Sequence, residues 1–152
     1  MRSMIPTAVL ALLTVASIPA CASGFDDKTF DQQSIDALEA KAIMAQPREQ
    51  CFLYAEIVHE MTEFSLRQYA AGDVGKATDL LHQIQGLAQK IHLSMAEDNK
   101  RLKNSEILLR HTAFRLNEML HNSSFEDREI VKETLVQVNQ AQSETMLQVF
   151  RK

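Results

Sequence analysis

The most constraining feature of this sequence is the stretch 74–121, which contains no proline and, after Gly75, one glycine, Gly86. Starting at Ala77, alternate steps of four and three residues reach a row of positions that are mostly apolar. This spacing is typical of a helix that packs against other helices. Because no strong helix breaker interrupts the row, the sequence predicts a continuous or mildly kinked helix over 74–121. The row is polar only at Asp98, Ser105 and Thr112, and a break near residue 99 into two ordinary helices is the alternative.

The segment before this stretch predicts two more helices. Apolar residues recur at helical spacing over 34–44, and Pro47 suits the first position of a second helix over 47–71. Gly72 is a natural left-handed stop, and the side chain of Asp73 can cap the helix that follows. A turn this short requires the helices on either side of it to be antiparallel.

The end of the chain predicts a last helix over 125–150, with Ser123 and Glu126 as a capping box. Aromatic residues make up only 6% of the chain, and turn-forming residues are few, which argues against an all-β sandwich or barrel. We therefore expect an all-α fold of antiparallel helical hairpins around one long central helix, resembling a three- to four-helix bundle. Two or three helices bury little surface, so the core is completed by folding over or by self-association.

The first 22 residues have the three parts of a secretory signal peptide. Arg2 precedes an apolar run over 8–18, which is too short to span a membrane, and the small-residue pattern Ala20-x-Ala22 follows. Cleavage after Ala22 is one processing route. The other is lipidation of Cys21, because residues 18–21 read as a degraded lipobox. Either route predicts an exported protein, periplasmic or secreted, and the second adds a lipid anchor.

After either route, Cys51 remains as a single cysteine in an oxidising compartment. Such a residue is either buried as a small hydrophobe or forms a disulfide with a second chain. The apolar neighbours Phe52, Leu53 and Tyr54 favour burial. Residues 23–30 show no periodicity and read as a flexible lead-in to a single helical domain over 31–152.

Several classes of function lack their sequence signature here. The net charge of −4 gives no electrostatic footprint for nucleic acid. The chain has no Gly-rich phosphate loop, no G-x-S-x-G elbow and no C-x-x-C pair. We therefore interpret the protein as a non-enzyme without a cofactor.

Two Glu-x-x-His pairs, Glu56–His59 and Glu118–His121, are the strongest metal-ligand pattern. Residues three apart share a helix face, and di-iron carboxylate bundles use two such pairs. On a continuous central helix, however, the pairs would lie about 45 Å apart, and in a broken one they would lie at opposite ends. A metal-binding bundle is therefore an alternative to the main interpretation.

Three segments carry a resemblance to a family. The stretches 46–54 (QPREQCFLY), 100–104 (KRLKN) and 110–116 (RHTAFRL) resemble a family of uncharacterised exported bacterial helical proteins. The resemblance implies export and helicity, and it implies no site. The sequence thus predicts an exported helical protein that acts through protein–protein contacts, most simply by self-association, with an envelope lipoprotein scaffold anchored at Cys21 as a further alternative.

Overall fold

The computed structural model describes residues 31–95 and 100–151, and these residues are all-α, with no strand among them. The signal peptide proposed for residues 1–22, the lead-in over 23–30 and the lipidation at Cys21 lie outside the described residues. The helices of the described part are α1 (Gln32–Met44), α2 (Pro47–Ala70), α3 (Val74–Leu93), α4 (Leu102–Asn122) and α5 (Arg128–Phe150).

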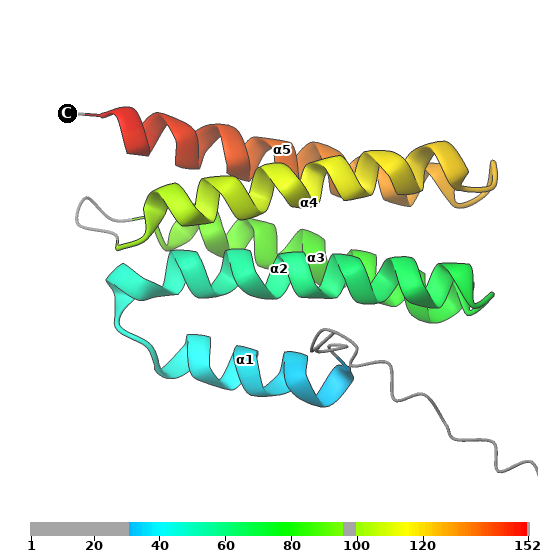
Figure 1. The fold of residues 1–152 in the computed structure, drawn as a ribbon, viewed down its shortest axis with the longest axis horizontal. Coiled ribbons are helices and arrows are strands. Elements are labelled where there is room, and N and C mark those ends of the chain that lie inside the picture. The colour runs from blue at the N-terminus through cyan, green and yellow to red at the C-terminus, as the bar shows by residue number, and fades with distance from the viewer. Residues whose placement is uncertain (1–30, 96–99, 152) are drawn as a thin grey trace, which may run out of the picture.

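Two antiparallel hairpins, α2–α3 and α4–α5, lie side by side and form a four-helix bundle (Figure 1). The second hairpin lies on the first so that α2 contacts α4 and α3 contacts α5. In both of these contacts the two helices run in the same direction (Figure 1). Helix α1 packs on the outside of α2. The all-α fold of antiparallel hairpins is therefore confirmed.

The prediction of one continuous helix over 74–121 is wrong. Helix α3 ends at Leu93, where the Ser94 hydroxyl donates to the Ile91 carbonyl, and α4 begins only at Leu102. Arg101 adopts the left-handed conformation, with φ of 60°. A straight rod over 74–121 would be about 72 Å long and would leave much of its apolar row in water. Folding back lets both halves of the row share one core.

The row of alternate four- and three-residue steps faces this core in both helices. Ser105 and Thr112, which look like polar interruptions of the row, are fully buried. Their hydroxyls donate to the carbonyls of Arg101 and Leu108, each one helical turn earlier. A hydroxyl whose hydrogen bond is made locally can be buried at little cost. The buried apolar members of the row are Ala77, Leu81, Ile84, Ala88, Ile91, Leu109, Leu116 and Met119.

The turns at one end of the bundle agree only partly with the sequence. Gly72 has a φ of 86°, and the Asp73 carboxylate accepts from the Lys76 N–H at 3.1 Å, so both helix-end predictions are confirmed. The predicted capping box of Ser123 and Glu126 is wrong, because the Ser123 hydroxyl donates to the Met119 carbonyl and closes α4.

The reciprocal capping pair forms one residue later than predicted. The Ser124 hydroxyl donates to the Asp127 carboxylate at 2.6 Å and accepts from the Asp127 N–H at 3.2 Å. The Tyr69 hydroxyl, at the end of α2, also donates to Asp127 and accepts from the Ser124 N–H. The last helix therefore begins at Arg128, and its first turn is tied to the end of α2.

Candidate functional site

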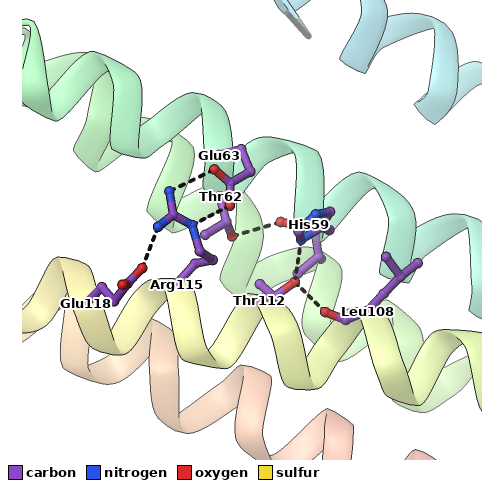
Figure 2. Close-up of polar contacts among 8 residues, drawn as sticks. His59, Thr62, Glu63, Leu108, Thr112, Arg115 and Glu118 are labelled. Carbon is purple, nitrogen blue, oxygen red and sulfur yellow. Dashed lines mark hydrogen bonds and ion pairs between the residues drawn. The ribbon is translucent and has the colours of Figure 1, made fainter. Parts of the chain in front are cut away.

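The contact between α2 and α4 holds the largest group of interacting polar side chains described here. These side chains carry both signs of charge and two imidazole rings. Those labelled in Figure 2 come from both helices and bond across the contact. We call this group the α2–α4 polar cluster. Its members are His59 and Glu63 on α2 and His111, Thr112, Arg115 and Glu118 on α4.

Hydrogen bonding fixes the tautomer of His59. The Thr112 hydroxyl donates to the Leu108 carbonyl at 2.8 Å, so its single hydrogen is already used. The His59 Nδ1 atom lies 3.2 Å from that same hydroxyl oxygen (Figure 2). Nδ1 must therefore be the donor, and the lone pair of the neutral ring lies on Nε2.

The environment of His59 favours this neutral form. Burial lowers the pKa of His59 first, and the nearby His111 and Arg115 lower it further, against an opposing effect of Glu63. The two imidazole rings lie with their centroids 5.1 Å apart and their planes tilted by 57°. His111 is exposed, whereas His59 is half-buried, so this ring pair forms the solvent-facing part of the cluster.

An ion-pair group completes the cluster. The guanidinium of Arg115 donates to both carboxylate oxygens of Glu63, at 2.7 and 3.0 Å, and to the carboxylate of Glu118 on its own helix (Figure 2). Burial raises the pKa of Glu63, but the hydrogen bonds and charge of Arg115 lower it more, so the net shift is downward. The hydrogen bonds that Arg115 donates to Glu63 in turn raise the pKa of Arg115. This bidentate geometry fixes how far α2 and α4 are shifted against each other along their axes.

The carboxyl group of Glu60, next to the cluster, is a weaker acid than an ordinary glutamate. Burial raises its pKa to about 7, with further contributions from the charges of Glu56 and Glu63 on the same helix and an opposing one from Arg67. Glu56 and Glu60 also line a shallow pocket between α2 and α4. The two carboxylates share this pocket with the side chain of Arg101.

The structure does not bring the two predicted Glu-x-x-His pairs together. The parallel contact of α2 and α4 has an offset of 53 residues, so Glu56 lies level with about residue 109. Glu118 is about nine residues further along, or about 14 Å along the axis. That separation is shorter than the sequence suggested, but it is still far beyond the reach of one ion.

The residues of the two Glu-x-x-His pairs also have different surroundings. His59 joins the α2–α4 polar cluster, Glu118 is held by Arg115, and the His121 Nδ1 atom bonds to the Asn117 carbonyl at 2.7 Å. In the described ranges, no group of three or more His, Cys, Asp or Glu side chains is arranged to hold a metal ion. The partner that His59 does have, His111, was not found by sequence reasoning. The offset between α2 and α4, which brings the two rings together, is set by tertiary packing and leaves no local pattern.

The burial predicted for Cys51 is confirmed, because its side chain has no exposed surface. Burial raises the pKa of its thiol, against smaller opposing effects of hydrogen bonds to Ser105 and Ser94. The alternative, a disulfide to a second chain, does not fit this position, because the helices would have to separate before another thiol could reach Cys51.

A second candidate surface is the outer face of α5. A row of exposed side chains follows the helix there at alternate steps of four and three residues. Beside it, an open groove of about 560 Å³ runs between α3 and α5, with Ala88, Leu93 and Ala141 among its lining residues. We call the row the α5 outer row, and it consists of Val136, Gln140, Ser143, Leu147 and Phe150.

Comparisons of this chain with protein-family models, with curated proteins and with solved structures find no match. Among the helices of the described residues, none is both long and apolar enough to cross a membrane.

Proposed function

We propose that this chain is an exported helical protein that acts through protein–protein contacts, and that its first partner is a second copy of itself. The signal-peptide pattern over residues 1–22 supports export. The α5 outer row supports the contact, and it is the single observation that carries this proposal.

The α5 outer row has the spacing of a coiled-coil seam but has no partner helix among the described residues. Val136, Leu147 and Phe150 are 58%, 67% and 77% exposed. Val136 and Leu147 lie opposite the face of α5 that carries Val131 and Val138 into the core. Steps of four and three residues are those with which one helix packs along another. An exposed row with large apolar side chains on a folded bundle favours a protein contact.

A second copy of α5 fits this row when the two helices run antiparallel. A two-fold axis at Ser143 places Val136 of one copy level with Phe150 of the other. The small Ser143 side chains then meet at the axis, where they let the helices approach closely and one hydroxyl can donate to the other. Such a contact uses the same patch on both copies, as in most symmetric dimers.

Light scattering and sedimentation of the purified chain test the contact. We expect a dimer at micromolar concentration, and we expect Leu147→Glu to shift it to a monomer, because the change buries a charge at the interface. Phe114→Glu is the matched control, since Phe114 is 58% exposed on the outer side of α4 and should leave the dimer intact. A wild-type monomer, or a dimer that survives Leu147→Glu, would remove the support for self-association.

Mass spectrometry of the exported protein tests the N-terminal part of the proposal. A mature chain that begins at Ser23 indicates ordinary cleavage. A lipidated N-terminal Cys21 indicates an anchored envelope scaffold. A chain that retains Met1 after expression in a bacterium with active export would contradict the proposal.

A further inference from the structure

We propose that His59 and His111 form a binding site for one divalent transition-metal ion of the zinc type, which links α2 to α4. This site differs from the Glu-x-x-His arrangement that the sequence suggests. It uses one imidazole from each hairpin, with water completing the coordination. It is also independent of any contact between copies of the chain.

The spacing of the two rings suits a shared ion. A zinc ion lies about 2.1 Å from a coordinating imidazole nitrogen and therefore about 3.2 Å from the ring centroid. With a near-tetrahedral angle at the metal, two such rings have centroids about 5 Å apart. The centroids of His59 and His111 are 5.1 Å apart, and the rings are tilted by 57° rather than stacked. The separation of the two rings is therefore that of two imidazoles that share one ion.

The hydrogen bond to Thr112 prepares His59 as a ligand. Imidazoles that bind metals commonly donate their other N–H to a fixed acceptor, which holds the tautomer and the ring orientation. Here the Nδ1–H of His59 donates to the Thr112 hydroxyl, whose own hydrogen is used by the Leu108 carbonyl. The Nε2 lone pair is consequently available. Thr112 acts in this proposal as a positioning residue.

Solvent access and the pairing of nearby charges allow an ion at this position. The nearby positive charge of Arg115 is compensated by its two carboxylate partners, Glu63 and Glu118. Because His111 is exposed, an ion can reach the ring pair from solvent without opening the bundle.

Titration of zinc chloride into the untagged, chelator-treated full chain tests this site, by calorimetry and by thermal unfolding. We expect one ion per chain and a rise in Tm with zinc concentration, since the ion binds the folded state. His111→Ala should weaken zinc binding at least about ten-fold and remove the rise in Tm. Thr112→Val keeps the side-chain shape but loses the acceptor, and it should weaken binding about ten-fold, as changes behind a metal ligand do.

Exposed histidines elsewhere in the bundle provide the matched controls. His82→Ala on α3 and His121→Ala at the end of α4 should leave zinc affinity within about two-fold of wild type, because neither lies at the ring pair. His111 is at the surface, so its replacement should leave the fold intact, which circular dichroism checks. The proposal would be overturned if the wild type did not bind zinc. It would also be overturned if His111→Ala and His82→Ala weakened zinc binding equally.

Discussion

The contact within the first hairpin and the contact between the two hairpins are built differently. Helices α2 and α3 meet mainly through apolar side chains, such as Ile57, Met61 and Leu81, all of which are buried. Helices α2 and α4 meet through the polar cluster, where imidazole, hydroxyl, guanidinium and carboxylate groups bond across the helices. A similar polar link occurs between α3 and α5, where Gln85 donates to Thr134.

This difference follows from how the helices are connected. The short turn at Gly72 fixes the register of α2 against α3, so few directional bonds are needed there, such as the one from the Ser65 hydroxyl to the Ala77 carbonyl. No short turn joins α2 to α4 or α3 to α5, and apolar side chains tolerate sliding. Directional bonds such as Glu63 to Arg115 have one good register. We infer that apolar contacts supply most of the stability of each hairpin, while polar contacts align the two hairpins.

The largest expected effect comes from the apolar contact. Leu81→Ala removes a side chain that is 1% exposed and should lower the free energy of unfolding by about 3 kcal/mol, through lost burial and a cavity. Urea unfolding followed by circular dichroism measures this change. His82→Ala, one residue further on an exposed position, should change it by less than about 0.5 kcal/mol. Equal effects of the two changes would contradict the packing of α3.

A smaller effect is expected in the α2–α4 polar cluster. Arg115→Ala should lower the free energy of unfolding by about 1–2 kcal/mol, because it leaves the half-buried Glu63 carboxylate without its partner. A double-mutant cycle with Glu63→Ala should give a coupling energy of about 1 kcal/mol. Additive effects of the two changes would show that this ion pair does not form.

The turn that sets the hairpin register should show an effect of about 1 kcal/mol. Gly72→Ala places a side chain at a φ of 86°, where L-residues are strained, and should destabilise the chain by about that amount. Gly86→Ala is the control, since Gly86 lies inside α3 and a Cβ there meets open space. It should stabilise the chain by up to about 1 kcal/mol. Thermal unfolding of the two variants should therefore shift in opposite directions.

The smallest effect concerns Cys51 and depends on pH. Because burial raises its pKa, the folded state holds the thiol proton at pH values where the unfolded state has lost it. The contribution of Cys51 to stability is therefore fully present below the ordinary thiol pKa and decreases as the pH rises through the folded value.

Urea midpoints measured against pH test this effect, with Cys51→Ala as the control that lacks it. Disulfide-exchange reagents at pH 8, applied to a Cys21→Ala chain, should in addition modify Cys51 far more slowly when the protein is folded. Rapid modification of the folded chain would contradict the burial of Cys51.

The elements that local patterns specify could be predicted from the sequence. Pro47, Gly72 and Asp73 indicated helix ends through their backbone preferences, and the structure has them there. The apolar row over 74–121 identified the core face of both α3 and α4. Ser105 and Thr112 looked like polar interruptions of that row. Nothing in the sequence shows that their hydroxyls bond to carbonyls of their own helix and can therefore be buried.

The features that depend on tertiary packing could not be predicted. The reversal between Leu93 and Leu102 contains no proline or glycine, so the apolar row alone favoured a continuous helix. The α2–α4 offset that pairs His59 with His111 follows from that reversal. The Glu-x-x-His spacing instead pointed to Glu118 and His121, which the parallel arrangement places about two and a half turns too far along α4.

The reversal between α3 and α4 is the central structural claim, and one distance tests it directly. Paramagnetic labels at Ala70, near the end of α2, and at Asn117, near the end of α4, lie on either side of one groove between these helices. In a chain with both natural cysteines replaced by alanine, electron–electron dipolar spectroscopy should report a separation of about 10–20 Å, as for neighbouring helices. A continuous helix over 74–121 would instead place the labels about 60 Å apart, and a separation near that value would contradict the account.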